Sequence, residues 1–286
     1  MAQEKENKKP NEARMTIWEH LSELRRRLTV IIIALLVAVV VIYFFAPDLI
    51  FILIQPVAGW ISGQPVETIE QMKATINVFD PLGGFTLRFK VSLFFGVIAT
   101  SPIWIWQAMA FFLPALKPNE KKWVVPTFFV AVLLFAGGLV FCYFIILDPA
   151  FGFLLSQTQD FATVFANASE YISMILLFEI AFGLAFQLPL IVFYLVVFNI
   201  VPYKKLRSSW RVVYVALLVF SAMVTPDASP VTMILMFAAM LLLYEISLLA
   251  SRIVLRKRIK TLEEMEAAKE EEEEETKEIA KDVENA

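Results

Sequence analysis

The sequence predicts an all-α integral membrane protein with six transmembrane helices, both termini in the cytoplasm and a short final hairpin. Of its 286 residues, 59% are hydrophobic and only 19% are charged, and the mean hydropathy is +0.69. A soluble domain is about 45 to 50% apolar and about 25% charged. The apolar residues also form long blocks, and the basic residues lie almost entirely on one side of these blocks. The structural unit is therefore the membrane span.

Six blocks match the length that a membrane-spanning helix needs, which is about 20 apolar residues for about 30 Å of hydrocarbon. The predicted spans are 28–46, 91–116, 123–147, 172–198, 212–224 and 231–250. The apolar core of the first exceeds the roughly 7 to 15 residues of a signal peptide, and no small-x-small cleavage site follows, so we expect an uncleaved span. The last two are short, since span five holds about 13 residues and Glu245 interrupts span six after about 14, roughly 20 Å of helix each.

The distribution of basic residues predicts the orientation. The N-terminal arm, the loops after spans two and four, and the C-terminal tail together hold 22 of the 25 Lys and Arg residues, and the opposite side holds Lys73, Arg88 and Lys90. Basic loops stay in the cytoplasm, so both termini are predicted there. Three domains follow: a cytoplasmic N-terminal segment with an interfacial helix (1–27), a six-helix membrane domain (28–250) and an acidic cytoplasmic tail (251–286), either disordered or a solvated helix.

The composition argues against most enzyme classes. One cysteine (Cys142) and one histidine (His20) cannot form a disulfide framework, a zinc cluster or a Cys/His nucleophile pair within the chain. The glycines form neither a Walker-type phosphate loop nor a GxGxxG motif. We therefore expect no enzymatic activity, with no catalytic residue, no metal and no cofactor.

Two carboxylates stand at the predicted cytoplasmic interface. Glu23 lies on a polar face of the N-terminal helix, where its simplest interpretation is an i,i+4 ion pair with Arg27 worth about 0.2 to 0.5 kcal/mol. Glu120 is the acidic residue of the basic loop PALKPNEKK, which Pro114 and Pro118 stiffen. Its simplest interpretation is a solvated loop residue. Together, the two carboxylates could instead accept a basic ligand.

Polar residues inside the spans are the other candidates, because an intramembrane carboxylate is expensive. Glu179 and Gln187 lie in span four, and eight residues of regular helix would place them within about 80° of each other on one polar face. They could contact a partner helix, or bond to neighbouring spans and hold the bundle together. Glu245 lies near the cytoplasmic end of span six, where snorkelling or pairing with Arg252 explains it better than a site.

Beyond these residues, motifs in order through most of the chain resemble the TatC family, the multispanning subunits of twin-arginine protein translocases. The motifs are HLSELRRRL at 20–28, Pro56, FDPLGGFTLRFKVSL at 79–93, MAFFLPALKPNEKK at 109–122, AFGLAFQLPL at 181–190 and VTPDASP at 224–230. The pattern of Phe, Pro, Ala-Leu and Glu in the first cytoplasmic loop is the most specific of these. The first 14 residues and the acidic tail lie outside the resemblance.

The resemblance implies a receptor and core subunit of a Sec-independent translocase. Such a protein binds twin-arginine signal peptides of folded cargo, assembles with single-span subunits of the TatA/TatB type, forms a homo-oligomeric complex in the lipid bilayer of the bacterial cytoplasmic membrane, and uses the proton motive force; it binds no nucleic acid. The implied signal-peptide site carries over onto Glu23, Arg25, Phe111, Pro114 and Glu120.

Three further positions follow from the resemblance. Pro56 and Asp227 match function-sensitive positions in the outer loops. Many relatives carry Glu where this chain has Gln187, so a titrating role there is either absent or moved to Glu179.

Two other functional classes fit parts of the pattern. An ion-coupled secondary transporter would use Glu179, but such transporters show internal repeats or paired broken helices, which this sequence lacks. A structural membrane scaffold would not need the cytoplasmic carboxylates.

Overall fold

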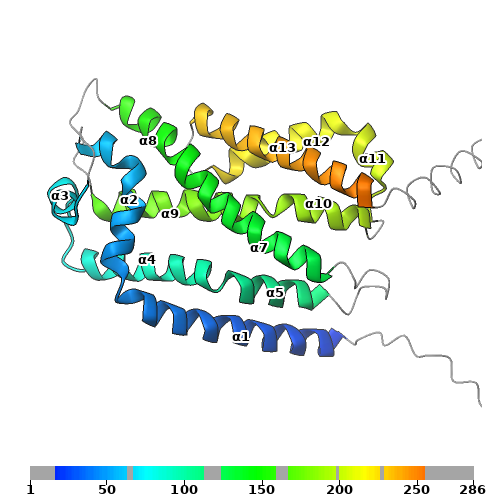
Figure 1. Cartoon of the computed structure of the whole chain (residues 1–286), viewed down its shortest axis with the longest axis horizontal. Coiled ribbons are helices and arrows are strands. Elements are labelled where there is room, and N and C mark those ends of the chain that lie inside the picture. Colours follow the sequence, from blue (N-terminus) through cyan, green and yellow to red (C-terminus); the bar gives the residue numbers. More distant parts are fainter. Residues whose placement is uncertain are drawn as a thin grey trace, which may run out of the picture. The chain divides into compact units, whose positions relative to one another are not determined.

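The apolar blocks fold into helices because hydrocarbon offers no hydrogen-bond partner, so each span has to pair its own backbone groups. The structure is a computed structural model that describes residues 17–62, 67–112, 124–158, 167–197, 200–225 and 229–254 (Figure 1). Its elements, in chain order, are α1 (Ile17–Tyr43), α2 (Ala46–Ser62), α3 (Ile69–Thr75), α4 (Gly83–Ala99), α5 (Ser101–Phe112), α7 (Val124–Phe141), η2 (Cys142–Ile146), α8 (Leu147–Ser156), α9 (Ala168–Ala185), α10 (Leu188–Val197), α11 (Tyr203–Ser208), α12 (Trp210–Val224) and α13 (Pro230–Val254).

The all-α membrane fold is confirmed. Within the described residues, four helical runs are long and apolar enough to cross a membrane: His20–Tyr43, Val124–Ser156, Ala168–Val197 and Pro230–Ile253. Helices α4 and α5 make a fifth if they form one span with a 58° bend, and α12 is a shorter apolar helix. Helices therefore occupy all six predicted positions, whereas the number of crossings and the side of each terminus stay predictions.

The final hairpin is short in only one of its two arms. Helix α12 has 15 residues, about 22 Å at 1.5 Å per residue. Helix α13 has 25 residues and continues through Glu245, so the short part of this arm is the apolar stretch before Glu245 and not the helix. The Glu245 carboxylate accepts hydrogen bonds from Arg207 and Tyr214.

The helix of the third predicted span extends past residue 147. Helix α8 continues it to Ser156. Pro149 lies shortly after the π-helical turn η2, within the continuous helical run Val124–Ser156.

Span four is interrupted where Gln187 lies. Helix α9 ends at Ala185 and α10 begins at Leu188. The Gln187 N–H donates to the carbonyl of Leu184, only three residues back, at 3.0 Å. Pro189 explains the irregular turn, because it cannot donate the N–H that the carbonyl of Ala185 would accept in a continuous α-helix. Ala168–Val197 still forms one run long enough to cross a membrane, and the shared face of Glu179 and Gln187 stays a prediction.

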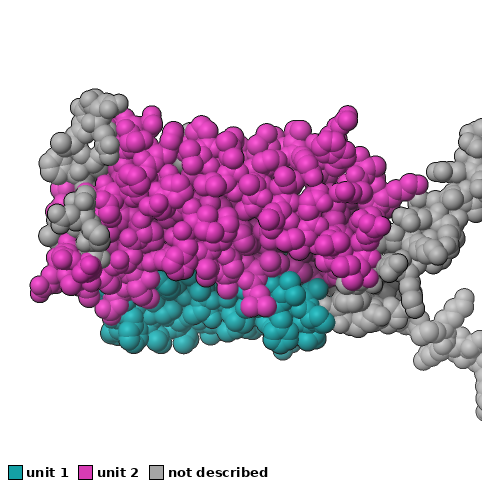
Figure 2. Space-filling model, turned by 45° about the horizontal axis from the view of Figure 1, so that its top comes forward, with its two compact units in different colours: residues 1–47, 88–132 teal, residues 48–87, 133–286 magenta. Residues whose placement is uncertain are grey.

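The chain divides into two compact units (Figure 2): unit 1 comprises 1–47 and 88–132, and unit 2 comprises 48–87 and 133–286. Within unit 1, α1 packs along α5. Within unit 2, α10 and α12 pack against α13, and α9 packs against η2. Each unit therefore has its own helix packing.

Two adjacent glycines of α7 have opposite surroundings. A Cβ atom on Gly138 would lie 2.7 Å from the carbonyl oxygen of Phe182 and 3.0 Å from the Cα of Gly183. On Gly137 it would meet nothing within 4 Å. Small residues let membrane helices approach closely, so Gly138 sets the separation of α7 and α9.

We therefore expect Gly138→Ala to lower the free energy of unfolding by about 1 to 3 kcal/mol, since a backbone carbonyl has to move. Gly137→Ala is the matched control, and we expect it to be neutral or slightly stabilising because Ala favours helix. Thermal unfolding of the two variants in the same detergent measures the difference. Equal stabilities would show that the close crossing of α7 and α9 does not require Gly138.

Candidate functional site

A polar cleft lies in unit 1 between α1 and α5. Helix α1 has 27 residues, about 40 Å, which exceeds the thickness of the hydrocarbon. Its charged first turns therefore extend beyond the apolar layer. The cleft encloses about 340 Å³ and is lined by Glu23, Arg26, Arg27, Val30, Trp106 and Gln107.

The Arg27 guanidinium joins the two walls of this cleft. Its Nε and Nη2 donate to Oε1 of Glu23, Nε at 3.1 Å, and its Nη1 donates to Oε1 of Gln107 at 3.1 Å. The predicted i,i+4 ion pair is thus present, with about 20% of each side chain exposed. All three contacts leave the second carboxylate oxygen of Glu23, Oε2, buried without a hydrogen-bond partner in the described part of the chain. A buried carboxylate oxygen without a donor is costly.

Phe111 lies at the same end of α5 as the cleft. Its ring stacks on His20 of α1, with ring centroids 4.2 Å apart and an interplanar angle of 24°. The structure thereby places two of the predicted site residues, Glu23 and Phe111, along the same pair of helices. Arg25 is exposed, and Pro114 and Glu120 lie outside the described residues.

The sequence analysis missed Gln107 and Trp106. Gln107 precedes Phe111 by four residues, so helical spacing places both on one face of α5. A polar residue at that spacing from a site residue, in an otherwise apolar span, was the available signal.

Glu179 lies inside unit 2. It is 3% exposed, and its Oε1 has no hydrogen-bond partner among the residues that the structure describes. Cys142 and Tyr143 of η2 lie within its electrostatic reach. Glu179 is therefore buried within this chain, and its contact with a partner helix stays a prediction. Gln187, in the break after α9, is half-buried.

The structure describes Pro56, one of the two positions assigned to the outer loops from the sequence. Pro56 lies inside α2, half-buried. Asp227 lies outside the described residues. Within the described ranges, no group of three His, Cys, Asp or Glu side chains is placed to hold a metal ion.

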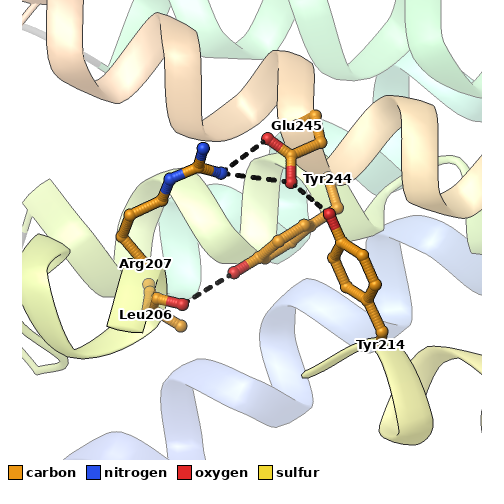
Figure 3. Close-up of polar contacts among 5 residues, drawn as sticks. All are labelled: Leu206, Arg207, Tyr214, Tyr244 and Glu245. Atoms are coloured by element: carbon orange, nitrogen blue, oxygen red, sulfur yellow. Dashed lines mark hydrogen bonds and ion pairs between the residues drawn. The ribbon is translucent and has the colours of Figure 1, made fainter. Parts of the chain in front are cut away.

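A second polar cluster joins α11, α12 and α13 (Figure 3). Glu245 accepts a hydrogen bond from the Tyr214 hydroxyl at 2.7 Å and from Nη1 of Arg207 at 3.1 Å. The neighbouring Tyr244 hydroxyl donates to the carbonyl of Leu206 at 3.2 Å. The predicted partner of Glu245 was Arg252, so the pairing was right in kind and wrong in partner. Sequence spacing suggests partners on the same helix, whereas these come from other helices.

The helices and the polar cleft define a multi-pass membrane protein, and comparison with known proteins supplies the family. Residues 19–238 match the family described as Sec-independent protein translocase protein (TatC). The TatC protein of Aquifex aeolicus is 37% identical over 246 residues, 85% of this chain and 98% of that protein. The TatC protein of Carboxydothermus hydrogenoformans is 32% identical over 241 residues, 84% and 94% of the two chains.

A solved structure supports the same family assignment. A crystal structure of the twin-arginine translocase receptor TatC in DDM is 34% identical, with a TM-score of 0.66, and the match covers 82% of this chain and 99% of that one. The chain therefore belongs to the TatC family of Sec-independent protein translocase proteins. It is a multi-pass membrane protein of Tat protein transport.

The two contacts of Glu245, with Tyr214 and with Arg207, should contribute unequally to the free energy of unfolding. Tyr214→Phe removes a short hydrogen bond to a carboxylate, and we expect it to lower the free energy of unfolding by about 1 kcal/mol. Arg207→Gln removes an ion pair whose arginine side chain is 59% exposed, and we expect a loss below about 0.5 kcal/mol because solvent screens such pairs. Chemical denaturation in detergent measures both. A larger effect of Arg207→Gln would mean that the ion pair, not the hydroxyl, holds α13 to its neighbours.

Proposed function

We propose that this protein is the receptor and core subunit of a twin-arginine translocase, and that the cleft between α1 and α5 receives arginines of the signal peptide. The observation that carries the proposal is the buried, unpartnered Oε2 of Glu23 in an open cleft. A guanidinium presents several N–H donors to such an oxygen, and charge-assisted bonds of this kind are strong. Membership of the TatC family and the similarity to a solved twin-arginine translocase receptor support the same assignment.

The cleft already binds one guanidinium. Gln107 and Oε1 of Glu23 hold that of Arg27, which fixes the carboxylate with Oε2 unoccupied. The ring pair of His20 and Phe111 supplies an apolar platform along the same two helices. Glu120, in the segment of the sequence that follows α5, provides the second carboxylate for the second arginine.

We expect Glu23→Gln and Glu120→Gln each to weaken binding of a twin-arginine peptide by roughly tenfold to more than a hundredfold. The reason is the loss of a charge-assisted hydrogen bond, about 1.5 to 3 kcal/mol, with little change in shape. Binding to purified protein in lipid nanodiscs, measured by fluorescence anisotropy, tests this. Glu70→Gln, an exposed position in the first turn of α3, is the control and should bind normally. Unchanged affinity in both site variants would rule out the carboxylate pair.

The same proposal includes the cellular setting. The protein lies in the bacterial cytoplasmic membrane with both termini in the cytoplasm, as the basic loops indicate. It works in a homo-oligomeric complex with single-span subunits of the TatA/TatB type and moves folded proteins under the proton motive force. An ion-coupled transporter is the weaker alternative, because the match to the TatC family covers most of the chain.

We propose that the partner helix contacts this protein at Gln187, between α9 and α10, and not at Glu179. In a Cys142→Ser background, Gln187→Cys should crosslink to the single-span subunits, whereas Glu179→Cys should not, because that position is buried. Site-specific crosslinking in membranes, followed by blotting for the small subunits, makes the comparison. Efficient crosslinks from position 179 with none from 187 would reverse the assignment.

A further inference from the structure

Pro56 leaves one carbonyl of α2 without its helical donor. In an α-helix, the carbonyl of Ile52 would accept from the N–H of residue 56, and proline has none. The hydroxyl of Tyr143 donates to the carbonyl oxygen of Ile52 at 2.7 Å. The proline thus creates an acceptor on α2, and η2 supplies the donor.

The π-helical turn η2 brings one donor, the Tyr143 hydroxyl, and one acceptor, the Asp148 carboxylate, to the side that contacts α2. The Leu147 N–H donates to the carbonyl of Cys142, five residues back, so this turn closes after five residues. Tyr143 and Asp148 would lie about 140° apart on a regular α-helix, whereas a turn closed at five residues brings them near one side. Asp148 accepts from the indole Nε1 of Trp60 at 2.7 Å.

The two contacts match the spacing of α2. Ile52 and Trp60 are eight residues apart, about 80° on a helix surface, so both can face η2 and α8. Gly152, one turn after Asp148, makes room for the indole: a Cβ atom there would lie 2.8 Å from Cζ2 of Trp60. The polar contacts and the packing therefore fix the same orientation of α2.

We propose that Pro56 is a positioning residue that works through Tyr143. By freeing the carbonyl of Ile52, it creates one of two attachment points, Tyr143 to Ile52 and Trp60 to Asp148, that hold α2 in one orientation against η2 and α8. Protein transport depends on that orientation. This proposal goes beyond signal-peptide recognition, because none of these residues lines the cleft of unit 1.

The test is a double-mutant cycle on export of a twin-arginine reporter. If Pro56 acts through Tyr143, Pro56→Ala and Tyr143→Phe remove the same attachment, so the double variant should export no worse than the weaker single variant. Independent roles would instead multiply the two losses, and that result would overturn the proposal. Tyr203→Phe, a tyrosine of α11 in the same unit, is the matched control and should export normally.

Hydrogen exchange gives a readout that does not depend on signal recognition. In nanodiscs, Tyr143→Phe should raise amide exchange within α2 about tenfold, the effect of losing one hydrogen bond, while peptide binding stays normal. Asp148→Asn keeps an acceptor oxygen for Trp60, so amide exchange and export should both stay normal. Asp148→Leu removes the acceptor and should raise amide exchange within α2 and reduce export. Unchanged exchange in Tyr143→Phe, or equal behaviour of the two Asp148 variants, contradicts the two-point attachment. If Tyr143→Phe showed normal exchange but lost peptide binding, that result would instead count against the cleft of unit 1 as the peptide site.

Discussion

Hydrocarbon cannot hydrogen-bond a backbone carbonyl, and this constraint governs where the helices of this protein break. At three places in the described helices, a carbonyl accepts from a donor other than its usual one. At the bend between α4 and α5, the indole of Trp104 donates to the carbonyl of Val97 at 3.0 Å. At the break after α9, the N–H of Gln187 donates to the carbonyl of Leu184 at 3.0 Å. In α2, the donor for Ile52 comes from another helix. Interruptions satisfied locally bend one helix, whereas this last one joins two.

The sequence located the helices well and their ends poorly. Hydropathy averages the side chains of a window, so it finds apolar blocks regardless of their neighbours. It does not show that the helix of the third span continues through Pro149 to Ser156. It also does not show that Glu245 has partners on α11 and α12, because those residues are distant in the sequence.

The candidate site was predictable to the extent that it follows helical spacing or family motifs. Glu23 was expected either to pair with Arg27 or to bind a ligand, and the geometry accommodates both, because the pair uses one carboxylate oxygen and leaves the other unoccupied. The sequence did not single out Gln107 as a partner of Arg27, since that hydrogen bond depends on α1 packing against α5. The shared face of Glu179 and Gln187 stays a prediction, because hydrogen bonds around Gln187 join residues three apart and change the angular count there.

The occupancy of Glu23 bears on how the cleft would distinguish arginine from lysine. A planar guanidinium gains most over an ammonium group when both oxygens of one carboxylate grip its two parallel N–H bonds. Arg27 already takes Oε1, so Glu23 offers an incoming side chain only one oxygen. A point charge satisfies one oxygen nearly as well as a fork does. In the proposed site, Glu23 would therefore supply affinity for a cation with little chemical selectivity, and rejection of lysine would have to come from a carboxylate with both oxygens free or from the spacing of the two sites.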